Sequence, residues 1–489
     1  MKSINRKWWK HGVMYQVYPR SFFDSNGDGV GDLAGIHQKL DYLKDLGVDI
    51  LWVSPFYQSP NDDNGYDVSD FRKILAEFGT MDDFDRLLDG IHQRGMRLIM
   101  DLVPNHTSDE HMWFQEAKKS KDNPYRDYYI WESTPKDSPP SNWLSFFSGS
   151  AWEWEEETEE YYLHLFSRKQ PDLNWENEKL RQEMYDIMRF WLDRGIDGFR
   201  LDVVPLISKR PGYPSIDQED FQSAIVEVYA NGPRVHEFLR EMNEKVSQDY
   251  DMLTLAEGCG IPSDQANLYV GEDRKELDML YHFEHLFMGL GPNGRYDPIP
   301  FSLVEFKAAF DLWYKSLGEE GWAAVCLGNH DFPRMLSRFG NDAEYREVSA
   351  KLLITLLASQ RGTLCMYQGD ELGMTNVAFD SIEDYDDVEA KNYYQEQAVG
   401  KDADTQQVVL RKIQRCGRDN ARTPIQWDDL PNGGFTTGTP WLKVNPNFKV
   451  INAEQQQHDP DSILSYYMKI LRLRKENPVL VYGEYESLL

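Results

Sequence analysis

The chain has 489 residues, of which 82 are Asp or Glu and 52 are Lys or Arg, and its formal net charge is −30. A charge of this size repels phosphate backbones and anionic lipids, so the composition argues against nucleic-acid and membrane-surface partners. The first residues lack the apolar run of a signal peptide, and no segment approaches the roughly 20 apolar residues that span a membrane. We therefore expect a cytoplasmic protein that acts on a neutral small molecule.

Short apolar runs alternate with amphipathic helical stretches along most of the chain. The first run, residues 13–18, precedes a predicted helix near residues 36–46, and the second run, 49–53, precedes a helix near 81–94. Further runs follow at residues 97–103, 198–201, 252–256, 279–283, 323–327 and 363–367. Strand–helix alternation indicates an α/β protein with parallel strands, and eight such strands predict a closed (β/α)8 TIM barrel. An open doubly wound sheet has the same periodicity and stays an alternative.

Two segments interrupt this alternation. Residues 105–175, after the third strand, are rich in Trp, Tyr, Ser and Pro and predict an inserted subdomain. Residues 369–458, after the eighth strand, are polar and predict a loop-rich insertion. An amphipathic helix at 462–475 then completes the barrel, which comprises residues 1–104 and 176–476.

Polar clusters follow four of the predicted strands, and the active site of a TIM barrel lies at these carboxyl-terminal strand ends. The clusters read DLVPNH (101–106), GFRLD (198–202), AEG (256–258) and NHDFPR (329–334). A single carboxylate at a strand end is commonly a helix cap or a partner in a buried ion pair. Several carboxylates that meet two histidines and two arginines at one barrel mouth indicate a catalytic site.

Glycoside cleavage with retention of configuration requires such a set of residues. It uses two carboxyl groups about 5–5.5 Å apart, one that attacks the anomeric carbon and one that protonates the leaving oxygen. Asp202 and Glu257 end adjacent predicted strands and form a candidate pair, and Asp331 is a third acidic group. Arg200 lies two residues before Asp202 and hence on the same side of the strand, where its charge would favour the ionised carboxylate.

The segments DLVPNH, GFRLDVV, LAEG and GNHDFPR resemble the four ordered sequence regions of glycoside hydrolase family 13, the α-amylase family. Four further segments resemble the branch of that family that holds oligo-1,6-glucosidases, dextran glucosidases and sucrose isomerases, and oligo-1,6-glucosidases above all. These segments are DSNGDGVGDL, SPNDDNGYDVSD, YYLHLFSRKQPDLNW and GRDNARTPIQWD. The resemblance extends from about residue 8 to the end of the chain, and it implies a retaining glycosidase on a (β/α)8 barrel.

The resemblance also implies a role for individual residues. Asp202 would be the nucleophile, Glu257 the acid/base and Asp331 the stabiliser of the transition state, with Asp101 in support behind them. The remaining residues would hold the terminal glucose: His106 and His330 at its hydroxyls, Arg200 beside the nucleophile, Asp63 and Arg418 as a closing pair, Tyr66 as a stacking platform, and Phe166 and Gln170 along the cleft.

An acidic loop near the N-terminus has the pattern of a metal site. Asp24, Asn26, Asp28, Val30 and Asp32 alternate along it with glycines between them, and oxygen ligands at such spacing suit Ca²⁺. The loop differs from an EF-hand because its twelfth position is glycine, so Asp32 would have to serve instead. In the family this segment binds Ca²⁺ or Mg²⁺ structurally, whereas a solvated Asp/Gly turn is the simpler reading of the residues alone.

The function implied is that of an exo-acting α-glucosidase on short oligosaccharides, with a preference for α-1,6 links such as that of isomaltose. By resemblance, Val203 after the nucleophile accompanies α-1,6 activity, whereas a smaller or polar residue accompanies α-1,4 activity. A sucrose isomerase is the main alternative, but those enzymes carry an Arg-Leu-Asp-Arg-Asp loop after the sixth strand that residues 284–294 lack. A non-catalytic relative would have lost catalytic residues that this chain retains.

Family members usually end in a β-domain of several dozen residues. Residues 477–489 correspond to the start of that domain, so we expect it to be largely missing from this chain. We expect a monomer, and buried free thiols at Cys326 and Cys365, because both cysteines lie in apolar runs and the four cysteines match no zinc pattern.

Overall fold

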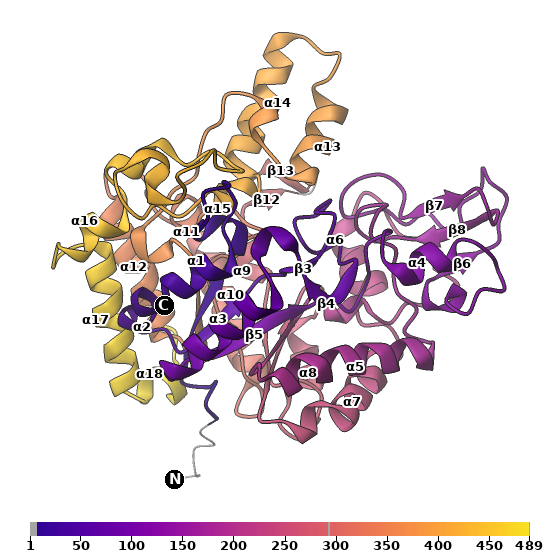
Figure 1. The fold of residues 1–489 in the computed structure, drawn as a ribbon, viewed down its shortest axis with the longest axis horizontal. Coiled ribbons are helices and arrows are strands. Elements are labelled where there is room, and N and C mark those ends of the chain that lie inside the picture. The colour runs from indigo at the N-terminus through magenta and orange to yellow at the C-terminus, as the bar shows by residue number, and fades with distance from the viewer. Residues whose placement is uncertain (1–6, 292–293, 489) are drawn as a thin grey trace.

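The computed structural model describes residues 7–291 and 294–488, and its centre is a barrel of eight parallel strands (Figure 1). The strands are β1 (Val13–Val17), β2 (Ile50–Val53), β5 (Arg97–Leu102), β9 (Gly198–Leu201), β10 (Leu253–Glu257), β11 (Met279–Tyr281), β14 (Ala324–Val325) and β15 (Thr363–Tyr367). They pair in the order β11-β10-β9-β5-β2-β1-β15-β14, and a parallel bridge between Leu280 and Ala323 joins the two ends. The predicted (β/α)8 barrel is confirmed, and the open sheet is excluded.

Helices cover the outside of the barrel. They are α1 (Leu33–Gln38) and α2 (Leu40–Leu46), then α3 (Met81–Gln93), α5 (Glu178–Arg194), α7 (Val235–Lys245), α8 (Ala266–Val270), α10 (Leu303–Leu317), α12 (Arg346–Ser359) and α17 (Ile463–Glu476). Their starts are capped locally: Thr80 and Asp83 form a capping box on α3, and the side chain of Asn177 caps α5. Such caps satisfy backbone N–H groups that would otherwise lack partners, and each contributes about 1 kcal/mol.

Alternate residues of the strands pack into two different apolar clusters. Val13 and Tyr15 of β1 belong to the large cluster between the strands and the helices, whereas Met14 belongs to a second cluster with Trp52 and Leu255. This alternation follows from the two-residue period of a strand, because successive side chains point to opposite faces. Each fully buried large apolar side chain contributes about 1.5–3 kcal/mol, so the two clusters hold the strand ends in place.

Gly198 allows β9 and β10 to approach closely. Its φ is 148°, and a Cβ at this position would lie 2.1 Å from the carbonyl oxygen of Leu253 on β10. A residue with a side chain would therefore push the two strands apart. This close pairing brings Arg200 of β9, and Asp202 directly after it, next to Glu257 of β10.

The inserted segment after β5 forms a separate lobe at one side of the barrel (Figure 1). It contains α4 (Met112–Ala117) and an antiparallel sheet of β6 (Trp131–Glu132), β8 (Glu160–Leu163) and β7 (Trp152–Glu155), in that order. A shorter antiparallel pair, β3 (Tyr57–Gln58) and β4 (Asp70–Ile74), follows β2. The lobe lies within residues 105–175, and its status as a subdomain stays a prediction.

The segment after β15 is not only loops. It contains α13 (Val388–Gln397) and α14 (Ala403–Cys416), which form a helical hairpin that projects from the barrel in Figure 1. It also contains the short helices α15 (Asp419–Arg422) and α16 (Ala453–Gln457). The expectation of a loop-rich insertion was therefore incomplete. Asp387 and Asp402 cap two helices in this segment, and these helices were not predicted because their exposed faces are polar.

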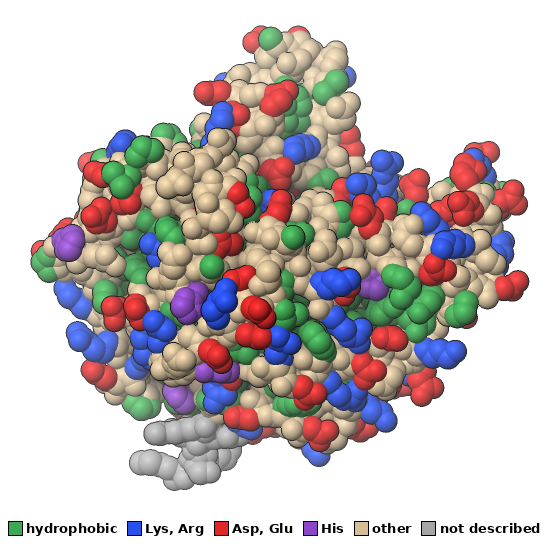
Figure 2. Space-filling model, viewed as in Figure 1, with side chains coloured by type: hydrophobic (Ala, Val, Ile, Leu, Met, Phe, Trp, Pro, Cys, Tyr) green, Lys and Arg blue, Asp and Glu red, His purple; other side chains and the backbone are tan. Residues whose placement is uncertain are grey.

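Besides short 3-10 helices such as Val204–Leu206, the described chain contains a few other short elements. They are a π-helix at Ile225–Tyr229, α6 (Phe221–Ala224), α9 (Glu284–Phe287), α11 (Met335–Phe339), α18 (Val479–Tyr482) and the antiparallel pair β12 (Leu290–Gly291) and β13 (Gly294–Pro298). Helix α18 lies in the segment that we assigned to a C-terminal β-domain, and that assignment stays a prediction. Among the described residues, no helix combines the length and apolar character needed to cross a membrane. On the face shown in Figure 2, Lys and Arg side chains are interspersed with Asp and Glu, which is typical of a solvated surface.

Candidate active site

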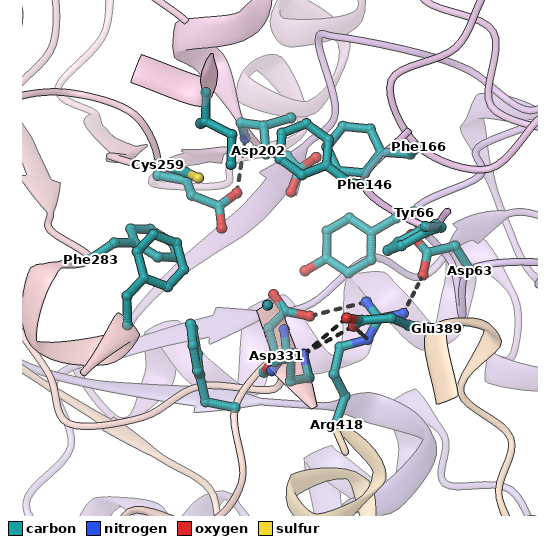
Figure 3. Close-up of a pocket in the computed structure, with 18 of the residues that line it drawn as sticks. Asp63, Tyr66, Phe146, Phe166, Asp202, Cys259, Phe283, Asp331, Glu389 and Arg418 are labelled. Carbon is teal, nitrogen blue, oxygen red and sulfur yellow. Dashed lines mark hydrogen bonds and ion pairs between the residues drawn. The ribbon is translucent and has the colours of Figure 1, made fainter. Parts of the chain in front are cut away.

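One pocket at the carboxyl-terminal ends of the strands brings together the three predicted catalytic residues. Asp202 follows β9, Glu257 ends β10 and Asp331 follows β14, and all three line this pocket. Figure 3 shows Asp331 and Arg418 on one side of the pocket, facing Asp202 on the other. The barrel thus places three carboxyl groups, from three different strands, around one cavity.

Arg200 connects the two carboxyl groups expected to react. Its Nη1 donates a hydrogen bond to Oδ1 of Asp202 at 2.6 Å, and its Nη2 lies 2.7 Å from Oε2 of Glu257. The same guanidinium pairs with Asp101 and donates to the hydroxyl of Tyr281 at 2.8 Å. Because one planar group contacts both carboxyls, they are held close together, as double displacement requires.

The charge of Arg200 and the burial of Asp202 act on the pKa of that carboxyl in opposite directions. Burial, with the nearby charges of Glu257 and Asp101, raises the pKa of Asp202 well above its usual range, and Arg200 opposes this only in part. As we expected, the guanidinium favours the carboxylate form of Asp202, and it is the first of the contributions that oppose burial.

Asp331 is in the opposite electrostatic situation. Burial alone would raise its pKa, but His330, Arg418 and Arg422 outweigh burial and hold the pKa of Asp331 well below its usual range. Arg422 Nη2 and Arg418 Nη1 lie 3.2 and 3.4 Å from its Oδ1. Burial lowers the pKa of His330 to about 3, so this imidazole is neutral near pH 7. At that pH the charges of the two arginines keep the pKa of Asp331 low. Asp331 is therefore a permanent negative charge in the pocket.

The end of the pocket next to Asp63 is lined by polar groups. Arg418 Nη2 donates to Oδ1 of Asp63 at 3.3 Å, and Nε2 of Gln170 donates to the other oxygen of Asp63 at 3.1 Å. Gln170 also contacts Nε2 of His106 at 3.2 Å. The ring of Tyr66 stacks on His330, with the centroids 5.1 Å apart and an angle of 5° between the planes. Donors and acceptors are thus fixed around a space with an aromatic floor.

Most of the substrate-binding residues that we predicted line this pocket directly. They are Asp63, Tyr66, His106, Phe166, Val203, His330 and Arg418. Gln170 and Arg200 are buried behind the wall and act on the pocket through the side chains that they contact. The structure therefore brings the whole set together, and the role of each residue stays a prediction.

Several residues of the pocket were not predicted from the sequence. Asp387 and Glu389, at the start of α13, contact Arg418, and Glu389 lines the pocket. Arg295 on β13 donates to the carbonyl oxygen of Asp331 at 2.7 Å and pairs with Glu389. Aromatic and apolar side chains form the remaining wall: Phe146, Phe147, Phe221, Ile225, Phe283, Phe287, Leu290 and Phe332. Phe283 ends a predicted strand and Phe332 lies in the cluster 329–334, but neither is a polar residue; the others lie away from the predicted strand ends, so strand-end reasoning could not find them.

The acidic loop lies between β1 and α1, apart from the pocket residues. Asp24 accepts a hydrogen bond from the backbone N–H of Asn26 at 2.9 Å, and Asp28 accepts one from that of Val30 at 2.9 Å. Burial raises the pKa of Asp32, although hydrogen bonds from neighbouring groups oppose this. Within residues 7–291 and 294–488, none of the three aspartates of this loop pairs with Lys or Arg.

Carboxylates without a Lys or Arg partner suit a divalent cation, although the oxygens of Asp24 and Asp32 already accept hydrogen bonds from backbone N–H groups. However, no three His, Cys, Asp or Glu side chains in the described part of the chain are grouped so as to hold a metal ion. Any site here would therefore need the amide oxygen of Asn26 and the carbonyl oxygen of Val30 in addition to the carboxylates. The metal stays a prediction.

Three kinds of comparison with known proteins agree with this geometry. The family description "Alpha amylase, catalytic domain" matches residues 16–483. Oligo-1,6-glucosidases from Parageobacillus thermoglucosidasius and Bacillus cereus are each 54% identical to the chain, over 99% of it and 87% of their own length. The solved structure of trehalulose synthase MutB from Pseudomonas mesoacidophila MX-45 has a TM-score of 0.95 and 49% identity, and the match covers 99% of this chain and 86% of that one. The pocket is that of a glycoside hydrolase, and the chain belongs to the α-amylase family.

Proposed function

We propose that the protein is a retaining, exo-acting α-glucosidase that hydrolyses short α-glucosides and prefers α-1,6 links. The observation that carries this proposal is the contact of one guanidinium, that of Arg200, with both Asp202 and Glu257. The names of the oligo-1,6-glucosidases at 54% identity support the substrate class and the linkage.

The proposed reaction has two displacements at the same carbon. Asp202 attacks the anomeric carbon of the terminal glucose while Glu257 gives a proton to the leaving oxygen, and a covalent glucosyl-enzyme forms. Water, deprotonated by Glu257, then attacks the same carbon and releases α-glucose. Asp331 is fully ionised and faces the ring, where its charge stabilises the oxocarbenium-like transition state.

Exo action is supported by the polar end of the pocket. Arg418, Asp63 and Gln170 are linked by hydrogen bonds, and the ring of Phe147 lies 4.9 Å from the guanidinium of Arg418. A terminal glucose has hydroxyl groups to satisfy these donors and acceptors, whereas a chain that continued past this end would displace them. The substrate is therefore held by its non-reducing end.

A sucrose isomerase is the second candidate function. It is favoured by one observation, the TM-score of 0.95 to trehalulose synthase MutB. The segment after β11 begins with helix α9 and reads EHLFMGLG over residues 284–291, without the charged loop expected of that activity. Hydrolysis is therefore the better proposal.

Separate incubations with isomaltose, maltose and sucrose test the proposal. We expect glucose from isomaltose at the highest kcat/KM, slower release from maltose, and glucose plus fructose as the main products from sucrose. Early NMR spectra should show the α-anomer of glucose first. Isomaltulose or trehalulose as the main product from sucrose would support the isomerase instead, and an early β-anomer would exclude the double displacement.

We also propose a structural Ca²⁺ or Mg²⁺ at Asp24, Asn26, Asp28, Val30 and Asp32, remote from the reacting atoms. When bound, the cation would neutralise the carboxylates of the loop and fix the connection between β1 and α1. We infer further that the enzyme is a cytoplasmic monomer without nucleic-acid or membrane partners, as its net charge of −30 favours.

A further inference from the structure

Val203, directly after the nucleophile, has a strained backbone. Its φ is 35° and its ψ is 36°, in the left-handed region. A β-branched residue is an outlier there, because its side chain crowds the backbone, and such strain persists only where the surroundings hold it. The strained peptide lies within the active-site pocket, so the conformation calls for a functional explanation.

Packing around Val203 holds the strained turn in place. The side chain is 8% exposed and belongs to an apolar cluster that includes Leu206 and Tyr229. The next residues form a tight helical turn, Val204–Leu206, in which the N–H of Leu206 donates to the carbonyl oxygen of Val203 at 2.9 Å. The turn is therefore anchored by a side chain and by its own backbone.

The result of this conformation is a hydrogen bond to the acid/base. The backbone N–H of Val203 donates to Oε2 of Glu257 at 2.9 Å, and Nη2 of Arg200 lies 2.7 Å from the same oxygen. Both groups that face Oε2 are donors. A proton on Oε2 would therefore have no acceptor to point at. The other oxygen, Oε1, has no such contact among the described residues.

We propose that Val203 is a positioning residue for Glu257, whose strained backbone N–H fixes Oε2 and leaves Oε1 as the oxygen that exchanges the catalytic proton. This inference rests on the proposed glycosidase function. In the first displacement the bond between carbon and the leaving oxygen breaks, the electron pair stays on that oxygen, and the oxygen takes the proton from Oε1. In the second, water gives a proton to Oε1 as its oxygen bonds to the carbon and the ester to Asp202 breaks.

Substrates that differ in their need for a proton provide the test. Isomaltose has a leaving alkoxide that must be protonated, whereas fluoride leaves α-glucosyl fluoride without protonation. The measured quantity is the ratio of kcat/KM on isomaltose to kcat/KM on α-glucosyl fluoride. A defect in the placement of Glu257 lowers this ratio, whereas damage to Asp202 or to the glucose pocket lowers both rates together.

Three residues at position 203 distinguish backbone conformation from side-chain bulk. V203A loses the anchoring side chain but keeps the strain of a Cβ, so the turn relaxes and the ratio should fall at least tenfold. V203G has no strain at this φ, so its ratio should lie between those of V203A and the wild type. V204A removes the same atoms from the next, fully buried residue and should keep the wild-type ratio. A ratio that falls from Val to Ala to Gly, or does not change, would overturn the proposal.

Neutron diffraction of the wild-type enzyme gives a second test that needs no variant. At a pH where Glu257 is protonated, deuterium should occupy Oε1 and the N–D of Val203 should point at Oε2. Deuterium on Oε2 would overturn the proposal whatever the variants do. If the wild type hydrolyses neither isomaltose nor α-glucosyl fluoride, the proposed function fails instead, which is a distinguishable result.

Discussion

Arg418 and Asp387 form a buried ion pair in which Nη2 of Arg418 donates a hydrogen bond to Oδ1 of Asp387 at 2.6 Å. Asp387 is the N-cap of α13, and Arg418 is the N-cap of α15. The same guanidinium reaches Asp63 at 3.3 Å and Asp331 at 3.4 Å. The contact with Asp387 is the shortest of these three, so Asp387 orients the arginine that the pocket presents to the sugar.

We expect D387N to weaken substrate binding more than turnover. The change removes the charge from a hydrogen bond worth about 1.5–3 kcal/mol, and Arg418 then has a less fixed position. KM for isomaltose should rise roughly tenfold or more, with a smaller fall in kcat. D386N, at the neighbouring and more exposed aspartate, is the matched control and should leave KM unchanged. An unchanged KM in D387N would mean that Asp63 and Asp331 alone orient Arg418.

The same ion pair should contribute to stability in a pH-dependent way. Burial alone would raise the pKa of Asp387, but Arg418 and Arg422 outweigh it and hold this pKa below its usual range. A carboxyl with a lowered pKa in the folded state stabilises above its unfolded pKa of about 3.9, and the contribution is lost as the pH falls further. Urea unfolding should therefore show a gap between the wild type and D387N at pH 6 that narrows below about pH 4. A gap independent of pH would contradict this assignment.

Variants of the reacting pair should separate the two chemical roles. D202A removes the nucleophile and should abolish turnover of isomaltose and α-glucosyl fluoride alike. E257Q should lower kcat on isomaltose by about 10²–10⁴-fold but retain far more activity on the fluoride, which needs no acid. Circular dichroism and melting temperatures would confirm that both variants fold. Near-normal isomaltose hydrolysis by either variant would remove that residue from the mechanism.

Removal of the metal should affect stability rather than chemistry. A cation that binds only the folded state at 100 times its Kd stabilises it by about 2.7 kcal/mol. We expect chelator to lower the Tm, and added Ca²⁺ or Mg²⁺ to restore it, while kcat well below the Tm stays constant. The double variant D24N/D28N should lack this response. A Tm that ignores chelator, with no metal found by elemental analysis, would exclude the site.

The barrel and the heart of the site could be predicted from the sequence because both have local signals. Apolar runs marked the strands, and Asp202, Glu257 and Asp331 each lie at or just beyond the end of one. Asp387 and Glu389 could not be found in this way, because they belong to a helix in a polar segment and reach the pocket only through tertiary packing. The contact of Arg200 with Glu257 was missed for a similar reason, since it depends on how β9 pairs with β10.

The preference for α-1,6 links depends on the side chain of Val203, which lines the pocket beside Asp202. A branched side chain there narrows the space just past the scissile bond. An α-1,6 link has an additional rotatable CH₂ and can bend around it, whereas the stiffer α-1,4 link cannot. Steric differences on the scale of one methylene are worth about 1–3 kcal/mol, or roughly 10–200-fold, so we expect preference rather than exclusion.

V203A should therefore raise kcat/KM on maltose relative to isomaltose. Both substrates have leaving groups that need a proton, so a displaced Glu257 lowers both rates, and a change in their ratio reports mainly the steric effect. V204A serves again as the control, because Val204 is buried outside the pocket. If the wild type already prefers maltose and V203A leaves the ratio unchanged, the side chain of Val203 does not set the linkage, while the hydrolase function stands on the tests of Asp202 and Glu257.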